Sequence, residues 1–222
     1  MPEGKRELSE LMIAKLIHDI SGPVGAVSNG LEYLTGEEGP IKEQAFALVK
    51  ESSEQLMARV QFYRIAYGFI YQTTEISISQ LRQLSEHMYE SSKVKLVWDN
   101  FATEASGIPL SNRLGKLLLN MLLISATCLL EGGTLKVALK RIDQGKQLCI
   151  GAEGPNVLVK PEWLEILLNT SSTAAIDTKN VQLHYTKLLA SDCEVTLEID
   201  HTKTSMMFMA SYTQANMPTA SA

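Results

Sequence analysis

The segment LIHDISGPVGAVSNGLEYL, residues 16–34, carries the pattern that decides the fold of the first part of the chain. Its apolar residues recur at three- and four-residue steps, the period of an amphipathic helix. Together with Ile13, which precedes the segment, they are Leu16, Ile17, Ile20, Val24, Val27, Leu31 and Leu34. We therefore expect a long helix with one apolar stripe. Its interior nevertheless contains Pro23 and three glycines, although a glycine costs about 1 kcal/mol and a proline about 3 kcal/mol relative to alanine. A purely structural helix would not need that loss.

A second helical pattern follows the loop TGEEGP, residues 35–40, where Pro40 suits the first turn of a helix. Two long helices joined by a short loop predict an antiparallel hairpin. Because such a hairpin buries too little surface alone, we expect a second copy to cover its apolar face, which gives a homodimer built on a four-helix bundle. The alternative is that the hairpin packs on the second half of its own chain.

The pattern changes after residue 75. Residues 79–91, 111–130, 161–169 and 179–190 are expected to be helices, and residues 94–99, 134–142, 147–152, 194–200 and 205–212 to be strands. Helices mixed with mainly antiparallel strands predict the α+β class, with an α/β sandwich whose helices cover one face of a sheet. We expect two domains, a helical hairpin at residues 1–75 and an α/β domain at residues 76–222.

Composition narrows the classes of partner. The net charge of −5 provides no basic excess for nucleic acid or an anionic membrane, so neither is an expected partner. The longest apolar run, residues 117–130, is interrupted by Asn120 and is too short to span a membrane. We expect a cytoplasmic protein whose cysteines are reduced, buried thiols: Cys128, Cys149 and Cys193. No ligand spacing predicts a metal site, and three histidines are expected to be structural or surface residues: His87, His184 and His201.

His18 lies about 150° from the centre of the apolar stripe on a helical projection, so it is expected to face solvent. Small and polar residues share its side of the helix, including Gly22, Gly25 and Asn29, and would let a partner approach closely. Pro23 lacks an N–H, so it leaves the Asp19 carbonyl without its helical donor and tends to kink the helix beside His18.

This arrangement fits phosphoryl transfer through an imidazole. Neutral histidine is nucleophilic near pH 7 and can form a covalent intermediate. Asp19 could orient the ring, and Lys15 could neutralise incoming phosphoryl oxygens. The alternative is that His18 and Lys15 are ordinary solvated surface residues.

The motif HDISGP, residues 18–23, resembles the H-[ED]-x-x-x-P phosphoacceptor box of sensor histidine kinases. The longer run 16–34, together with FYRIAYG at 62–68, is similar to the ChpT-type histidine phosphotransferases of alphaproteobacteria. The resemblance implies a dimeric four-helix bundle and a second domain like a degenerate histidine-kinase ATPase (Bergerat) domain. It implies His18 and Asp19 as catalytic residues, and a face for docking receiver domains that comprises Lys15, Ser21, Gly22, Pro23, Gly25 and Asn29.

The same resemblance implies that the second domain does not use ATP. Asn120 matches the first asparagine of the kinase N-x-x-x-N helix, but Ile124 replaces the second, which removes an oxygen ligand for Mg²⁺. The segment AEGPN, residues 152–156, lacks the aspartate and final glycine of the kinase D-x-G-x-G loop. The segment TKNVQLHYT, residues 178–186, has no glycine with which to cradle phosphates.

Without ATP or any other bound cofactor, the phosphoryl group must come from a protein. The resemblance implies that the receiver domain of a hybrid kinase phosphorylates His18, which then phosphorylates the receiver domain of a response regulator. Mg²⁺ would belong to those receiver partners. Three alternatives remain at this point: a working ATP-dependent kinase core, a dimeric scaffold that binds receivers without carrying phosphate, and a helical dimer with an unrelated α+β domain.

Overall fold

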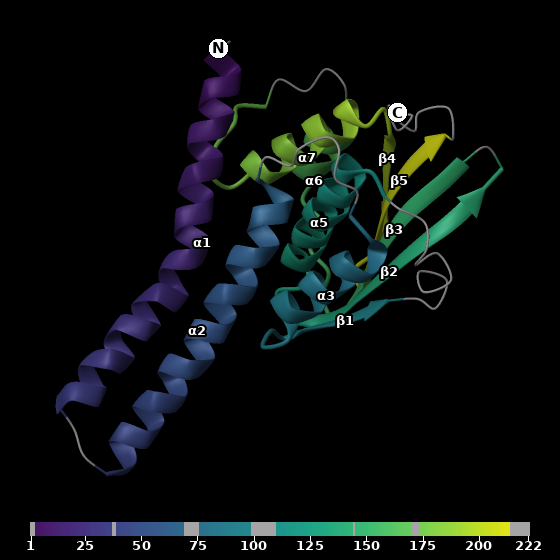
Figure 1. Ribbon diagram of the computed structural model, residues 1–222. Helices are drawn as coiled ribbons and strands as arrows, with labels where there is room; N and C mark the ends of the chain where they lie inside the picture. Colours follow the sequence, from purple (N-terminus) through teal and green to yellow (C-terminus); the bar gives the residue numbers. More distant parts are fainter. Residues whose placement is uncertain are drawn as a thin grey trace, which may run out of the picture.

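The computed structural model describes residues 3–36, 39–68, 76–98, 110–143, 145–169 and 174–213. The chain begins with the helices α1 (Glu3–Gly36) and α2 (Pro40–Ala66), which form an antiparallel hairpin whose loop end extends away from the rest of the molecule (Figure 1). The remaining elements are α3 (Ile78–Tyr89), β1 (Val94–Trp98), α5 (Asn112–Thr127), β2 (Gly133–Ile142), β3 (Gly145–Glu153), α6 (Pro161–Leu168), α7 (Val181–Asp192), β4 (Thr196–His201) and β5 (Ser205–Thr213). The predicted boundary near residue 75 lies outside the described residues.

The five strands form one sheet in the order β1-β2-β3-β5-β4. The β1–β2 pair is parallel and the other pairs are antiparallel. The helices α3, α5, α6 and α7 lie on one face of this sheet (Figure 1). The α+β class and the layering predicted from the sequence are therefore confirmed, and the observed elements end within a few residues of the predicted ones.

The core lies between α5 and the sheet. Leu117, Leu119 and Met121 on α5 are fully buried, as are Leu135 on β2 and Phe208 on β5. This explains the long apolar run of the sequence, because α5 has the sheet on one side and other helices on the other. None of the helices within the described ranges is both long and apolar enough to cross a membrane.

The two hairpin helices approach closely at Gly30. A Cβ atom at this position would lie 2.5 Å from Val49 Cγ2 and 3.3 Å from the Ala45 carbonyl oxygen. A glycine is therefore required here by the helix–helix contact. This separates Gly30 from the other glycines of the opening segment, which have open space around them.

The base of the hairpin packs against the second half of the chain, whereas the apolar stripe of α1 is divided. On α2, Phe62 and Ala66 are fully buried. On α1, Leu16 and Ile20 pack against the core as partly buried residues. Four other stripe residues are 47–57% exposed in the single chain: Ile13, Ile17, Val24 and Leu31. One chain thus covers only part of the predicted stripe.

Candidate functional site

His18 projects from the middle of α1 into solvent, as the helical projection predicts. Its side chain is 89% exposed, whereas that of the next residue, Asp19, is 19% exposed. The imidazole is therefore accessible to a large partner, and the neighbouring carboxylate is shielded by the protein.

Asp19 is held by groups from two helices. Its Oδ1 lies 3.4 Å from His18 Nδ1. Its Oδ2 accepts hydrogen bonds from Lys15 Nζ at 3.0 Å and from the Tyr63 hydroxyl at 3.3 Å. Burial, together with the nearby charge of Asp19, raises the pKa of Tyr63, so its phenol keeps the proton that it donates. The carboxylate is thereby fixed beside the histidine ring.

The main chain of the same residue has a further partner. Pro23 lies inside α1 and has no N–H for the Asp19 carbonyl four residues earlier. Arg59 Nη1 of α2 donates to this carbonyl oxygen at 2.7 Å. Sequence reasoning missed Arg59 and did not single out Tyr63. The available signal was the carbonyl left without a donor, but only the hairpin register shows which α2 residue reaches it.

The residues predicted for docking differ in their surroundings. Gly22 and Gly25 have no heavy atom within 4 Å of where a Cβ would stand. The Ser21 hydroxyl donates to the Ile17 carbonyl at 2.7 Å, Asn29 is exposed, and Pro23 is partly buried. The structure therefore brings Lys15 and Asp19 together with His18, and leaves an open helix surface at the two glycines.

A cleft of about 310 Å³ adjoins Asp19 where the hairpin meets the second half of the chain. From the hairpin it is lined by Lys15, Asp19, Arg59, Tyr63 and Tyr67, and from the second half by residues that include Trp163, Lys179 and Gln182. Tyr63 and Tyr67 stack with ring centroids 5.3 Å apart. The Tyr67 hydroxyl donates to Gln182 Oε1 at 2.6 Å, so this contact joins α2 to α7.

Asn120, the residue that matches the kinase Asn box, is completely buried. Its Nδ2 donates to the carbonyl oxygens of Ala66 at 2.9 Å and Lys116 at 2.7 Å, and its Oδ1 accepts from Gln182 Nε2. The amide therefore bridges α5, α2 and α7. Ile124, one turn later, is 2% exposed.

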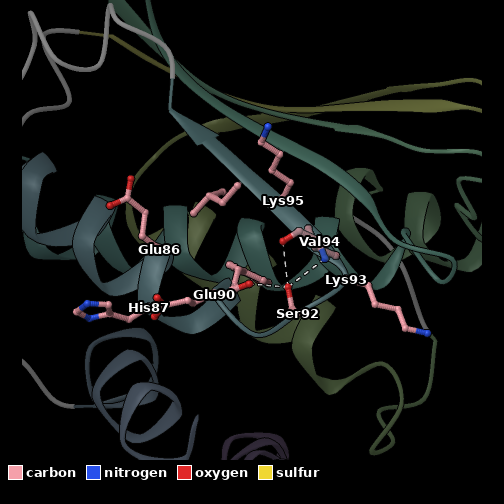
Figure 2. A pocket seen from close by; sticks show the side chains of 9 residues that line it. Glu86, His87, Glu90, Ser92, Lys93, Val94 and Lys95 are labelled. Carbon is pink, nitrogen blue, oxygen red and sulfur yellow. Dashed lines mark hydrogen bonds between the residues drawn. The ribbon is translucent and has the colours of Figure 1, made fainter. Parts of the chain in front are cut away.

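A second and larger depression lies between α3 and β1 (Figure 2). The Ser92 hydroxyl lies 2.8 Å from the Tyr89 carbonyl oxygen, to which it can donate, and it accepts from the Val94 N–H at 3.1 Å, so it closes the turn between these elements. Figure 2 shows the side chains of Glu86, His87 and Lys93 pointing apart from one another. These groups do not converge on a common point, so this depression lacks the geometry of a catalytic site.

The cysteines and possible metal ligands in the described part of the chain do not form a second candidate site. Burial raises the pKa of Cys128 and of Cys193 to about 12, so both are protonated thiols at neutral pH. The three cysteines are free, and Cys193 is partly rather than fully buried, which corrects the prediction for this residue. Among the described residues there is no group of three or more His, Cys, Asp and Glu side chains that could hold a metal ion.

The model of the histidine phosphotransferase C-terminal domain family matches residues 78–205. This chain belongs to the histidine phosphotransferase family. The chain is 34% identical over 205 residues to the protein phosphotransferase ChpT of Brucella abortus (strain 2308). The aligned region covers 92% of this chain and 95% of that protein. As a member of this family, the chain is a phosphotransferase.

A solved structure of a bacterial phosphotransferase has the same fold as this chain. It is 32% identical, with a TM-score of 0.78 over 92% of this chain and 96% of that one. The histidine kinase AdeS of Acinetobacter baumannii matches more weakly, with 13% identity and a TM-score of 0.48 over 88% of this chain and 97% of that one. The resemblance to ChpT-type phosphotransferases seen in the sequence is confirmed by the relative and by the family model.

Proposed function

We propose that this histidine phosphotransferase carries a phosphoryl group on His18 within a phosphorelay. The group is accepted from the phosphoaspartate of a hybrid-kinase receiver domain and passed to the aspartate of a response-regulator receiver domain. The observation that carries the proposal is the geometry of His18: the ring is 89% exposed, and its Nδ1 faces a shielded carboxylate. A ring held in this way presents its other nitrogen to a partner.

The chemistry requires one bond to form and one to break. With the Nδ1 proton directed at Asp19, Nε2 carries the lone pair and attacks the phosphorus of the acyl phosphate. The N–P bond forms, the P–O bond to the partner's aspartate breaks, and the electron pair leaves with that carboxylate. The ring becomes positively charged, and the Asp19 carboxylate stabilises it through the Nδ1–H. Transfer onward to a regulator is the same step in reverse.

The surroundings of His18 suit the approach of a receiver domain. Lys15 lies one turn earlier and can help to neutralise the phosphoryl oxygens. We assign docking of the receiver to the face formed by Lys15, Ser21, Gly22, Pro23, Gly25 and Asn29. The lack of side chains at Gly22 and Gly25 would allow the receiver to come close to the ring, which in-line transfer needs.

We also propose that the phosphoryl donor is a protein rather than ATP, and that the Mg²⁺ of the reaction belongs to the receiver. In support, Asn120 is completely buried and its amide oxygen accepts a hydrogen bond from Gln182 Nε2, so this oxygen is not presented to a metal–nucleotide complex. An ATP titration followed by calorimetry tests this part. Binding in the micromolar range would overturn it.

The test of the carrier role uses a phosphorylated receiver domain mixed with the histidine phosphotransferase. We expect rapid appearance of acid-labile, alkali-stable label on the chain, as a phosphoramidate requires. His18→Gln should abolish the label, whereas the matched control His87→Gln, which changes an exposed histidine on α3, should not. Label retained in His18→Gln would rule out His18 as the carrier.

We further propose that two copies pair through the hairpins to form a four-helix bundle. Beside the exposed stripe of α1, α2 carries five exposed apolar residues: Ile41, Phe46, Leu48, Met57 and Val60. Exposed apolar surface repeated along two neighbouring helices is typical of a protein interface. A second copy would remove these side chains from water while leaving the His18 face of α1 open.

Light scattering after size-exclusion chromatography tests the pairing. We expect twice the chain mass of 24.5 kDa for the wild type. Phe46→Lys, which places a charge on a side chain that is 63% exposed in the single chain, should shift the population to monomer. Gln44→Lys, an exposed polar residue of the same helical turn, is the matched control. A monomeric wild type would contradict the proposal.

A further inference from the structure

The Asp19 carbonyl lies one residue from His18 and is the group that Pro23 deprives of its helical hydrogen bond. A proline four residues after a carbonyl supplies no N–H, and its ring also pushes against that carbonyl. A carbonyl without a partner at a partly buried position costs about 1–3 kcal/mol. The turn that carries the acceptor histidine therefore has a carbonyl without a helical donor, and a donor must come from outside α1.

Arg59 of α2 supplies a hydrogen-bond donor for the Asp19 carbonyl. Its Nη1 lies 2.7 Å from the Asp19 carbonyl oxygen, which is the length of a strong, charge-assisted hydrogen bond. The arginine is partly buried at the hairpin interface. The bond that is missing within α1 is thus made between the two helices.

The same face of α2 also reaches the side chain of Asp19. Tyr63 lies four residues after Arg59, one turn along the helix, and its hydroxyl donates to Asp19 Oδ2 at 3.3 Å. Residues four apart lie on one face of a helix. Two successive turns of α2 therefore hold one residue of α1, Arg59 through the main chain and Tyr63 through the carboxylate that faces the His18 ring.

We propose that Arg59 is a positioning residue, which replaces the hydrogen bond lost to Pro23 and so fixes the turn that presents Asp19 and His18. The proposal rests on the proposed function, because positioning matters only if His18 carries the phosphoryl group. It assigns Pro23 and Arg59 a joint role: the proline removes the helical donor of the Asp19 carbonyl, and the arginine holds that carbonyl in a single place.

The experiment is a double-mutant cycle in which the lost N–H is restored. Pro23→Ala returns a donor to the Asp19 carbonyl, so Arg59 should matter much less in that background. Single-turnover transfer from a phosphorylated receiver is measured for the wild type, Arg59→Gln, Pro23→Ala and the double variant. Arg59→Gln should slow transfer about tenfold in the wild type, as loss of a charged hydrogen bond suggests. In the Pro23→Ala background the same change should slow it less than about twofold.

Two further variants and a second readout complete the design. Arg59→Lys keeps a cationic donor and should restore transfer to within about threefold of the wild type. Arg64→Gln removes an exposed arginine near the end of α2 and should leave the rate unchanged. Thermal unfolding of the four proteins of the cycle should show Arg59→Gln lowering Tm by about 4 °C with Pro23 present, and by much less in the Pro23→Ala background.

Each outcome decides a different claim. An equal slowing of transfer by Arg59→Gln in both backgrounds would mean that Arg59 contacts the partner directly, and would overturn the proposal. Unchanged transfer in Arg59→Gln, or equal losses in Tm in both backgrounds, would overturn it as well. If the wild type itself acquires no label on His18, the proposed function fails, and that result is separate from a labelled wild type with no Pro23–Arg59 coupling.

Discussion

His18 and Asn120 both occupy positions that resemble motifs of histidine kinases, yet their surroundings are opposite. The His18 side chain is 89% exposed on a helix face with open space at its glycines. Asn120 is completely buried, and its amide bonds to three groups from three helices. The imidazole of His18 is available to another molecule, whereas the amide of Asn120 joins helices inside the protein through buried hydrogen bonds.

This contrast has a physical consequence for substitutions. Where a group faces solvent, its replacement changes little in the folded chain and acts on the encounter with a partner. Where a polar group is buried and fully bonded, its removal leaves its partners without hydrogen bonds and lowers stability. Changes near His18 should therefore affect transfer without unfolding, and changes at Asn120 should do the reverse.

The largest expected effect comes from filling the open surface at Gly22. Gly22→Leu should slow transfer from a phosphorylated receiver about a hundredfold, because a displacement of about 1 Å at the reacting atoms is enough for such a loss. Tm should not fall, since a Cβ at this position meets no neighbour. Gly4→Leu, the same change at another open position of α1, is the control. Transfer at the wild-type rate in Gly22→Leu would show that the receiver docks elsewhere.

The second effect concerns the buried hydrogen bonds of Asn120. Asn120→Ala should lower the free energy of unfolding by about 2–3 kcal/mol, because the Ala66 carbonyl oxygen and the Gln182 Nε2 group lose the hydrogen bonds that they make to Asn120. The transfer rate measured well below Tm should stay near that of the wild type. Urea unfolding gives the stability, with the exposed residue changed in Asn156→Ala as the control. A stable Asn120→Ala protein with lost transfer would reverse the assignment of the two regions.

The third effect separates two glycines of one helix. Gly30→Ala should lower the free energy of unfolding by about 1 kcal/mol, because the clash with Val49 Cγ2 outweighs the gain in helix propensity. Gly22→Ala should raise it by about the same amount, since only the propensity changes. Urea unfolding of the pair measures both. Stabilisation by both substitutions would show that α1 and α2 do not approach closely at Gly30.

The smallest effect is a pH dependence at the junction between the regions. Burial, followed by the nearby Tyr63 and Asp19, raises the pKa of Tyr67 above its ordinary value. The unfolded phenol ionises near pH 10 while the folded one stays protonated, so its contribution to stability is complete below that pH and is lost as pH rises. Between pH 8 and 10.5 the loss is about 0.8 kcal/mol.

Between pH 8 and 10.5 the unfolding free energy of Tyr67→Phe should therefore decrease by about 0.8 kcal/mol less than that of the wild type. Urea unfolding at both pH values measures the two decreases, whatever stability the variant has lost at pH 8. Identical decreases would mean that the phenol of Tyr67 is solvated in the folded chain.

The sequence predicted most of the fold because its elements are marked by local patterns. The amphipathic period of α1, the long apolar run of α5 and the alternation in β2 identify their elements without reference to distant residues. His18 could be placed on an exposed face for the same reason, since a helical projection needs only α1. The small neighbours Gly22 and Gly25 were likewise readable from spacing.

What the sequence could not provide depends on contacts between distant residues. Arg59 and Tyr63 meet Asp19 across 40 and 44 positions, and this requires the register of the hairpin. The bonds of Asn120 to Ala66 and Gln182 likewise depend on how the hairpin base packs against α5 and α7. The exposed half of the α1 stripe could not be foreseen either, because the fraction that α2 and the second half cover is a property of the packed chain.

The most direct measurement is to locate the phosphate itself. The wild-type protein is mixed with a phosphorylated receiver, kept at neutral or alkaline pH, digested, and analysed by mass spectrometry with fragmentation that preserves the N–P bond. We expect a single added phosphate on His18. A phosphate on another residue, or an unmodified chain after the receiver has lost its label, would contradict it.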